Sequence, residues 1–389
     1  MTKKSSTPAI RFKGFTDTWE QRKLGELADI VGGGTPSTGV SDFWDGDIDW
    51  YAPAEIAEQI YLTSSQRKIT EEGYNHSSAK MLPVGTVLFT SRAGIGKTAI
   101  LTRKGCTNQG FQSIVPHKGE LDSYFIFSRT EELKQYGETV GAGSTFVEVS
   151  GKQMANMELM MPKTMAEQKI IGQYFANLDH LITLHQRKYD KLTNVKKSML
   201  EKMFPKNGSN VPEIRFKGFT EAWEQRKVSE LFRVTRGNVL ATTLTAEAKT
   251  DEMPYPVYSS QTKDKGLMGY YKDYLYEDAI TWTTDGANAG TVCYRDGKFY
   301  CTNVCGVLLS DKVKANQMIA EALNNVSKGY VSYVGNPKLM NNVMADIEIQ
   351  IPSQSEEREH LSEFLTNLDN LITLHQRKWK RINFAVHTD

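Results

Sequence analysis

The chain has 389 residues, of which 39% are hydrophobic and 24% are charged, and its formal net charge is +1. This composition is that of a folded protein with room for two or three domains, and it excludes a disordered chain. The near-neutral charge excludes a protein that coats nucleic acid by bulk charge alone, but it is compatible with a basic face on one side.

The start of the chain and the number of cysteines indicate the cellular compartment in which we expect the protein. Lys3 and Lys4 are followed by polar residues where a signal peptide would be apolar, and no run approaches the roughly 20 apolar residues of a membrane span. Four cysteines do not make a disulfide framework. We therefore expect a cytoplasmic protein.

The first element, at residues 10–27, has a near-copy further along the chain. Residues 10–27 and 214–231 match at fourteen of eighteen positions with an offset of 204, and residues 177–188 and 367–378 match at eleven of twelve with an offset of 190. Cys106-Thr107-Asn108 recurs as Cys301-Thr302-Asn303, although three residues match easily by chance. The period is too long for a solenoid, so the repeat predicts two copies of a domain-plus-helix unit.

Between the matching frames, the interiors (32–155 and 234–345) share little sequence. Both contain short apolar runs broken by Gly, Asn, Asp and Pro, which is typical of strand-rich α+β domains. The expected elements are strands at 85–90, 279–282 and 297–300 and helices near Asp122–Gln135 and Asn316–Ser327. Identical frames around divergent centres indicate one scaffold that displays two different surfaces.

Several loops of the interiors combine small residues, amides and basic side chains. Arg and Lys pair with guanine, Asn and Gln pair with adenine, and small residues let the backbone approach a phosphate. The candidate DNA-binding residues are Thr35, Ser37, Ser91, Arg92, Lys97, Asn108, Gln109, Thr284, Asn288, Asn303, Asn336 and Lys338. For any single loop, an ordinary turn explains the same residues equally well.

Two long helices are predicted to follow the interiors. A capping-box pattern at residues 164–167 begins the first, which ends at Phe204-Pro205, and a similar pattern after Pro352 begins the second. Apolar residues recur at heptad spacing, so we expect helices near 164–204 and 354–382 to pair as an antiparallel coiled coil. The helix-pairing residues would be Ile171, Tyr174, Leu178, Leu181, Leu192, Val195, Leu361, Phe364, Leu368 and Leu371. The alternative is that each helix docks on its own domain.

The helices also carry a charge pattern and two equivalent histidines. Basic residues outnumber acidic ones seven to two across 187–206, which indicates a solvated face or a surface near phosphates or a partner subunit. His185 and His375 occupy equivalent positions, where a scaffold role is more natural than catalysis.

Motifs that would give the chain its own chemistry are incomplete. The segment 94–98 resembles the end of a P-loop, but Ser91 stands where that motif requires glycine. Cys293, Cys301 and Cys305 lack paired spacing and a nearby His, so we expect buried strand cysteines and no metal site. The sequence contains no methyl-donor loop and no nuclease-like acidic cluster. We therefore expect no catalytic residues and no cofactor in this chain.

Taken together, the duplication and several short motifs resemble the specificity subunits of type I restriction–modification enzymes, over essentially the whole chain. The order of the motifs carries the resemblance, since no one of them decides it. They are Gly34-Thr35-Pro36-Ser37, Gly46-Asp47-Ile48-Asp49-Trp50, Gly94-Ile95-Gly96-Lys97, Thr107-Asn108-Gln109-Gly110-Phe111, Ala166-Glu167-Gln168, Tyr255-Pro256-Val257-Tyr258-Ser259-Ser260 and Gly286-Ala287-Asn288-Ala289-Gly290.

The resemblance implies two target recognition domains, at 1–162 and 209–352, separated by helical regions at 163–208 and 353–389. The fold would be α+β, with the domains in a pseudo-two-fold arrangement. Each domain would read one half of a bipartite, asymmetric site on double-stranded DNA, and the helices would set the spacing. The chain would be a non-catalytic bacterial protein, held at the nucleoid through DNA.

The resemblance also implies partners. Two modification subunits would methylate adenine with S-adenosylmethionine, and restriction subunits would translocate and cleave DNA with ATP and Mg. After Lys378 the likeness to the first copy stops, so the last helical region is expected to be shortened. A stand-alone DNA methyltransferase and a coiled-coil protein-interaction adaptor are the alternatives.

Overall fold

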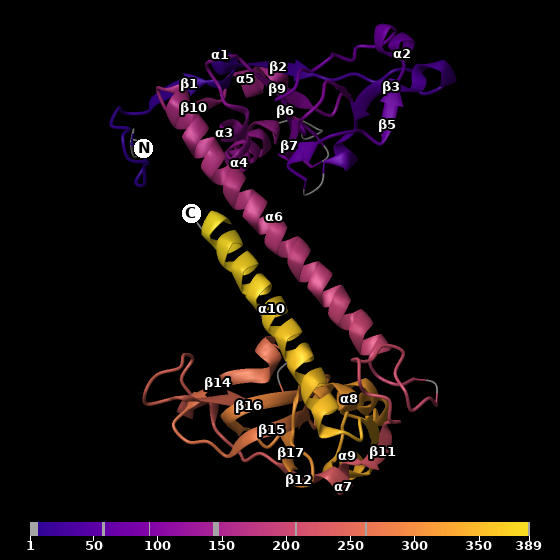
Figure 1. Cartoon of the computed structure of the whole chain (residues 1–389). Coiled ribbons are helices and arrows are strands. Elements are labelled where there is room, and N and C mark those ends of the chain that lie inside the picture. The colour runs from indigo at the N-terminus through magenta and orange to yellow at the C-terminus, as the bar shows by residue number, and fades with distance from the viewer. Residues whose placement is uncertain are drawn as a thin grey trace. The chain divides into compact units, whose positions relative to one another are not determined.

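The structure, a computed structural model, describes residues 7–56, 59–92, 94–142, 148–206, 208–260 and 263–387, without the side chains of 263 and 385–387. The chain divides into two units, Met1–Leu181 and Ile182–Asp389, and each has its own core (Figure 1). Both units combine β-sheets with helices, which confirms the predicted α+β class.

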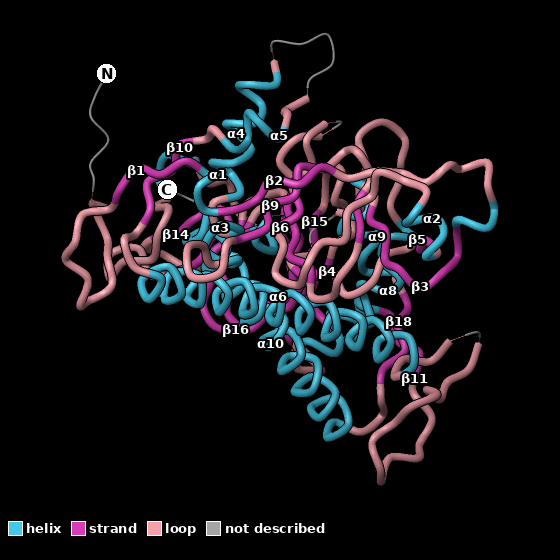
Figure 2. Tube along the Cα trace, turned by 90° about the horizontal axis from the view of Figure 1, so that it is seen from above, coloured by secondary structure: helices cyan, strands magenta, loops and turns pink. Residues whose placement is uncertain are grey.

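The first unit is built around two small mixed sheets. Its elements are β1 (Glu20–Lys23), α1 (Leu24–Leu27), β2 (Ala28–Gly32), β3 (Trp44–Tyr51), β4 (Tyr61–Leu62), β5 (Arg67–Ile69), α2 (Glu71–Asn75), β6 (Val87–Phe89), β7 (Thr98–Leu101), β8 (Cys106–Thr107), β9 (Gln112–Pro116), α3 (Ser123–Phe127), α4 (Thr130–Gly141), α5 (Gly151–Ala155), β10 (Glu158–Met161) and the start of α6 (Met165–Lys202). The sheet orders are β2-β9-β6-β7-β4 and β5-β3-β8, and Figure 2 shows β2, β9 and β6 next to one another. Phe89 of the larger sheet and Phe125 of α3 are fully buried in one core.

The second unit is built on a single six-stranded sheet. Its elements are the rest of α6, β11 (Glu224–Lys227), α7 (Val228–Leu231), β12 (Phe232–Arg236), β13 (Tyr255–Tyr258), β14 (Leu267–Tyr271), β15 (Tyr276–Thr283), β16 (Val292–Cys301), β17 (Cys305–Ser310), α8 (Gln317–Ser327), α9 (Asn341–Asp346), β18 (Glu348–Ile351) and α10 (Ser355–His387). The sheet order is β12-β17-β15-β16-β13-β14. Its core joins Trp282 of β15, Leu323 of α8 and Leu361 of α10.

The strands and helices expected inside the interiors are present with small differences. The predicted strands lie within or overlap β6, β15 and β16, and the helix predicted near 316–327 is α8. The helix predicted near 122–135 is instead two helices, because the backbone at Arg129 leaves the helical region. Asp122 caps the first of them by accepting hydrogen bonds from the N–H groups of Tyr124 and Phe125 at 3.0 and 2.9 Å.

The repeated frames build the same clasp in each unit. β1 pairs antiparallel with β10, and β11 pairs with β18 in the equivalent register. Beside each pair, a buried glutamate accepts two hydrogen bonds from an arginine: Arg11 to Glu167 at 2.7 and 2.8 Å, and Arg215 to Glu357 at 2.6 and 2.7 Å. Such a bidentate pair is strongly directional, so each clasp ties the first segment of its unit to the start of a long helix.

The long helices dock at their ends and meet further along. Ile171 packs against the core of the first unit and does not pair helices as predicted. Leu361 lies in the core cluster of the second unit, and Phe364 packs against that cluster together with residues of α6. Within the second unit, α6 and α10 run in opposite directions, with His185 Nδ1 2.9 Å from His375 Nδ1. We call these two residues the histidine pair.

Other parts of the predicted seam also differ from expectation. Tyr174, Leu181 and Leu371 are 47%, 39% and 43% exposed, so their side chains are not enclosed between helices. Tyr174 instead contacts Phe12 edge to face, with ring centroids 5.5 Å apart. Leu178, Leu192 and Val195 are half-buried, and Leu368 is buried. The last helix, predicted near 354–382, is α10 and runs to His387.

Candidate nucleic-acid interface

In the first unit, three loops that are distant in sequence are tied together by backbone hydrogen bonds. The Gly34 N–H donates to the Thr107 carbonyl at 2.8 Å, and the Ser91 N–H donates to the Gly110 carbonyl at 2.8 Å. A Cβ at Gly33 would lie 2.0 Å from the Asn108 carbonyl oxygen, so only glycine allows this approach. The loops after β2, β6 and β8 therefore form one surface.

This surface gathers most of the residues predicted for the first domain. The side chains of Thr35 and Gln109 are hydrogen bonded to each other, and Gln109 is exposed. Asn108 Oδ1 accepts the Gly110 N–H at 2.8 Å, while its amide NH2 has no acceptor among the described residues. Arg92 lies half-buried in the same group, and its Nε would be 3.7 Å from a Cβ at Gly110. Amides and a guanidinium in this arrangement suit base-edge readout.

Two further predicted residues lie at the edges of these loops. Ser37 is exposed, and its carbonyl accepts the indole N–H of Trp44 at 3.1 Å. Lys97 is exposed at the end of a tight turn, where its N–H donates to Thr90 Oγ1 at 2.9 Å. Neither side chain has a polar partner among the described residues, so both are available to a phosphate.

The second unit builds an equivalent surface from different residues. The Leu339 N–H donates to the Thr284 carbonyl at 2.8 Å, just as the Val149 N–H donates to the Ser91 carbonyl at 3.0 Å in the first unit. The Gly286 N–H donates to the Pro337 carbonyl at 2.9 Å. These bonds bring together Asn288, Asn303, Asn336 and Lys338; the last three are exposed, and Lys338 Nζ lies 3.9 Å from an Asp285 oxygen.

The short Cys-Thr-Asn match falls on equivalent strand ends of the two units, but it is out of structural register by one residue. Cys106-Thr107 pairs in parallel with β3, and the end of β16 pairs in parallel with β13. The Asn108 N–H donates to the Tyr51 carbonyl at 3.0 Å, and the Thr302 N–H donates to the Tyr258 carbonyl at 2.9 Å. In the structure Asn108 therefore corresponds to Thr302, and Asn303 is the next residue along the same loop.

Two of the predicted contact residues are not on the surface. Ser91 and Thr284 are 0% exposed, so a duplex cannot reach their side chains in this conformation. The Thr284 hydroxyl donates within the loop, to the Asp285 carboxylate and the Val304 carbonyl. The Thr284 hydroxyl thus stabilises the loop, and neither residue belongs to the proposed contact set.

Sequence reasoning missed an exposed apolar hairpin turn next to Asn336. Tyr333 and Val334 are 70% and 92% exposed, at the turn of a hairpin closed by paired hydrogen bonds between Ser332 and Lys338 at 2.9 Å. Apolar side chains in such positions contact thymine methyl groups or wedge between base steps. The only sequence signal is the Gly335-Asn336-Pro337 turn that follows them.

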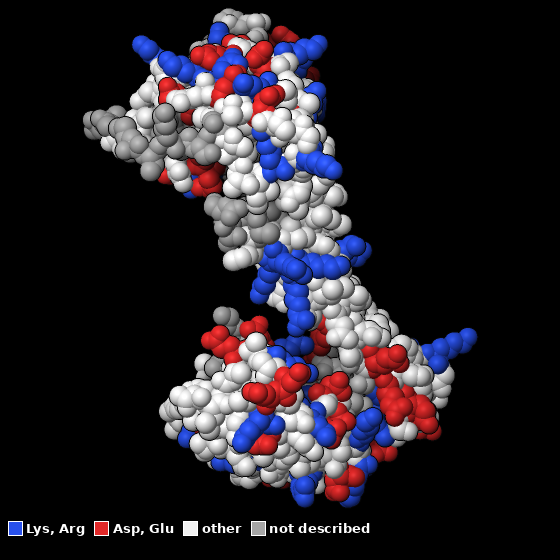
Figure 3. All heavy atoms as spheres, turned by 90° about the vertical axis from the view of Figure 1, so that its left-hand side faces the viewer, with Lys and Arg blue, Asp and Glu red and all other residues white. Residues whose placement is uncertain are grey.

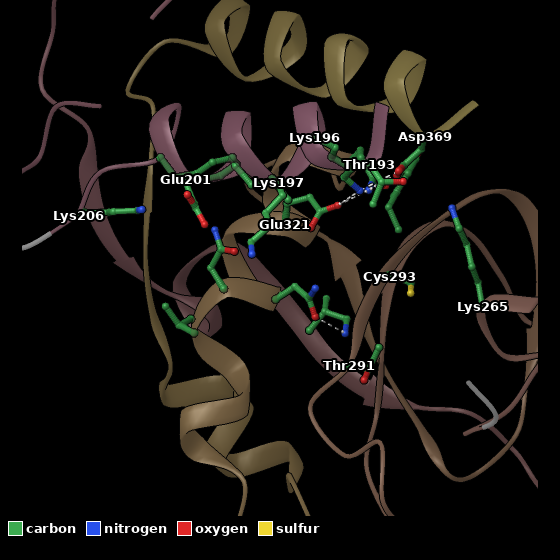
Figure 4. Close-up of a pocket in the computed structure, with 18 of the residues that line it drawn as sticks. Thr193, Lys196, Lys197, Glu201, Lys206, Lys265, Thr291, Cys293, Glu321 and Asp369 are labelled. Carbon is green, nitrogen blue, oxygen red and sulfur yellow. Dashed lines mark hydrogen bonds and ion pairs between the residues drawn. The ribbon is translucent and has the colours of Figure 1, made fainter. Parts of the chain in front are cut away.

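The second unit contains a cavity of about 810 Å³, lined by α6, α8 and β16 (Figure 4). Lys196 points into it from α6 and forms ion pairs with Glu321 at 2.6 Å and Asp369 at 2.8 Å. Burial lowers the pKa of Lys196, but the two carboxylates outweigh this effect and raise its pKa above the ordinary value. Gln317 Nε2 also donates to both carboxylates at 3.1 Å, so this cluster ties α6 to α8 and α10.

The cysteines and the remaining acidic groups suggest no chemistry. Cys301 and Cys305 are buried in strands as expected, and burial raises the pKa of Cys305 to about 11, which disfavours a thiolate. Within the described ranges, no group of three or more His, Cys, Asp or Glu side chains could hold a metal ion. Likewise, no helix in the described part of the chain has the length and apolarity to cross a membrane.

The fold and these loop surfaces define a tandem of two α+β domains that share a scaffold and differ in their exposed polar loops. The chain belongs to the type I restriction modification DNA specificity domain family, whose model matches residues 16–194 and again 220–383. The family assignment predicted from the sequence is therefore confirmed.

Individual relatives agree with this assignment. The type I restriction enzyme MjaIX specificity subunit of Methanocaldococcus jannaschii is 31% identical over 231 residues, which are 57% of this chain and 53% of that protein. The EcoR124I/EcoR124II specificity subunit of Escherichia coli is 28% identical over 160 residues, or 39% of each chain. The matched region is thus about half or less of these relatives' own length.

A solved structure shares the fold. The type I restriction-modification system S subunit from M. genitalium has a TM-score of 0.69 and 13% identity, and the match covers 98% of this chain and 97% of that one.

Proposed function

We propose that this chain is the DNA-reading subunit of a type I restriction–modification complex. Each unit would read one half of a bipartite, asymmetric site, and the helices would set the distance between the halves. The observation that carries the proposal is the pair of equivalent loop surfaces: the Ser91 carbonyl accepts the Val149 N–H in one unit, and the Thr284 carbonyl accepts the Leu339 N–H in the other.

This arrangement supports an asymmetric target for a physical reason. Two copies of one recognition surface on a two-fold frame read a palindrome, as dimeric DNA-binding proteins do. Here the frames are nearly identical, but the exposed side chains differ, so the two half-sites should differ in sequence.

The chemistry would belong to partner subunits. We propose two modification subunits that use S-adenosylmethionine to methylate an adenine taken out of the stack, and restriction subunits that use ATP and Mg. The chain itself would hold the DNA and the partners in register.

Mapping N6-methyladenine across the host genome, with and without this gene, tests the proposal. We expect one gapped motif with two unlike halves to lose its methylation when the gene is deleted. An unchanged methylation pattern would contradict the proposed function, as would the loss of methylation at an ungapped motif.

A further inference from the structure

The histidine pair marks a local two-fold axis within the second unit. His185 and His375 are equivalent residues of the repeat, 190 positions apart, and their Nδ1 atoms are 2.9 Å from each other. When equivalent residues of two antiparallel helices meet, the axis that exchanges the helices passes between them. Residues flanking one histidine are therefore matched by residues flanking the other.

Six cations around this axis share one face of the helix pair. At about 100° per residue, Lys188, Lys191 and Arg187 lie roughly 60°, 120° and 160° from His185 in the same rotational sense. Lys378, Arg381 and Arg377 hold the same positions relative to His375. A two-fold axis between antiparallel helices places equivalent residues on the same side. We call this set the cationic face: Arg187, Lys188, Lys191, Arg377, Lys378 and Arg381.

The charge of this face is not compensated by the protein. All six side chains are exposed, and none forms an ion pair with any residue that the structure describes. Asp190 lies beside Arg187 on α6, about 60° from it around the helix, but forms no ion pair with any described residue. Its carboxylate accepts a hydrogen bond from Gln186 at 2.9 Å. Figure 3 shows Lys and Arg gathered over the helical part of the chain.

The lysine charges near the axis affect the pKa of both histidines. Burial lowers the pKa of His185, and the positive charges of Lys378 and Lys188 lower it further. Burial also lowers the pKa of His375, followed by the charges of His185, Lys188 and Lys378. Lysines from both helices thus act on the same point, as the symmetry argument requires.

The cationic face matches the geometry of a duplex backbone. Lys191 and Arg381 lie on opposite sides of the axis, about 18 Å apart along the helices at 1.5 Å per residue. That length corresponds to about five base pairs at 3.4 Å each. A DNA duplex has two-fold axes of its own, so symmetric cations meet equivalent phosphates on its two strands.

We propose that the cationic face binds the phosphates of the DNA between the two half-sites. The helices then act on the unread gap directly, as a sequence-independent clamp, in addition to setting its length. This inference rests on the proposed function, because it requires a duplex that both units engage.

The test is the salt dependence of DNA binding by the complex of this chain with its modification subunits. The variant replaces two symmetric cations, Arg187→Gln with Arg377→Gln, and the duplex carries the motif found by methylation mapping. The slope of log K against log salt is negative, and each lost phosphate contact reduces its magnitude by about 0.9, so we expect a magnitude smaller by about 2. The methylated motif should stay the same, since the contacts do not read bases.

The matched control removes two charges that lie outside the cationic face, Lys197→Gln with Lys380→Gln, at about 120° and 140° from the histidines in the other rotational sense. Both lysines are exposed, and neither has an ion-pair partner among the described residues. The control should keep the wild-type slope. A second symmetric variant, Lys191→Gln with Arg381→Gln, should reduce the magnitude of the slope as the first one does, which guards against a folding defect of a single variant.

Two results would overturn the inference while leaving the proposed function intact. One is a wild-type slope in both cationic-face variants. The other is loss of a modification subunit from the complex, measured by native mass spectrometry, with the slope unchanged, because the face would then bind protein. If the wild-type complex does not prefer its motif over scrambled DNA, the proposed function itself fails, and this inference fails with it.

Discussion

Replacing Arg11 with methionine removes half of the clasp in the first unit and leaves a buried carboxylate behind. The Glu167 side chain is 2% exposed, and without Arg11 its remaining donor is the Trp19 indole N–H at 3.2 Å. Removing one partner of a buried ion pair costs about 3–5 kcal/mol. We expect the lower end, about 3 kcal/mol, because the Trp19 hydrogen bond persists and part of the Arg11 side chain was already hydrated.

Native-state hydrogen exchange measures this loss locally. A cost of about 3 kcal/mol corresponds to roughly 100-fold faster exchange of the amides that pair β1 with β10, at 1.4 kcal/mol per factor of ten. The repeat supplies the control: Arg215→Met should accelerate exchange in β11 and β18 and leave β1 and β10 unchanged. Equal effects of Arg11→Met on both units, or exchange of β1 and β10 within a factor of about 2 of wild type, would refute the reasoning.

Three further expectations concern pH and packing. Burial raises the pKa of Glu167, but the hydrogen bonds that it accepts outweigh this and leave its pKa below the ordinary value. Its stabilising effect is therefore full above about pH 4.3 and is lost as the pH falls below it, so the melting temperature of the first unit should drop as the pH falls from about 4.3 to 3. The pKa of both members of the histidine pair is lowered in the folded state, so the stability of the second unit should fall as the pH drops through about 6.5. NMR titration midpoints above about 6.5 for these histidines would contradict this expectation. A Cβ at Gly306 would lie 2.1 Å from the Trp282 ring, so Gly306→Ala should destabilise the second unit by about 1–3 kcal/mol in chemical denaturation, whereas Gly329→Ala, with nothing within 4 Å, should not.

The frames of the molecule were predictable because their signals are local. Capping boxes and uninterrupted helical stretches fixed the starts of α6 and α10 within a residue or two, and the near-identical segments around Arg11 and Arg215 announced two equivalent clasps. Heptad spacing, however, shows that a stripe is apolar without showing what covers it. Ile171 docks on its own domain, as the alternative interpretation held, whereas residues of α6 pack against the core cluster that contains Leu361.

The recognition surfaces were only partly predictable because they depend on long-range strand pairing. Gly34 and Thr107 are joined across the first unit by a hydrogen bond that no local pattern announces. Residue type indicated which loops are polar, but burial is set by tertiary packing, which enclosed Ser91 and exposed Val334. The three-residue Cys-Thr-Asn match was statistically weak, yet it marks the same strand edge in both units.

The most direct test asks whether each unit reads its own half of the target. N6-methyladenine would be mapped in cells that carry Asn108→Ala with Gln109→Ala, and separately Asn336→Ala with Lys338→Ala. We predict that the first variant relaxes or changes one half of the gapped motif and the second variant only the other half. If both variants alter the same half, or if neither alters the motif, the two loop surfaces are not independent readers of DNA.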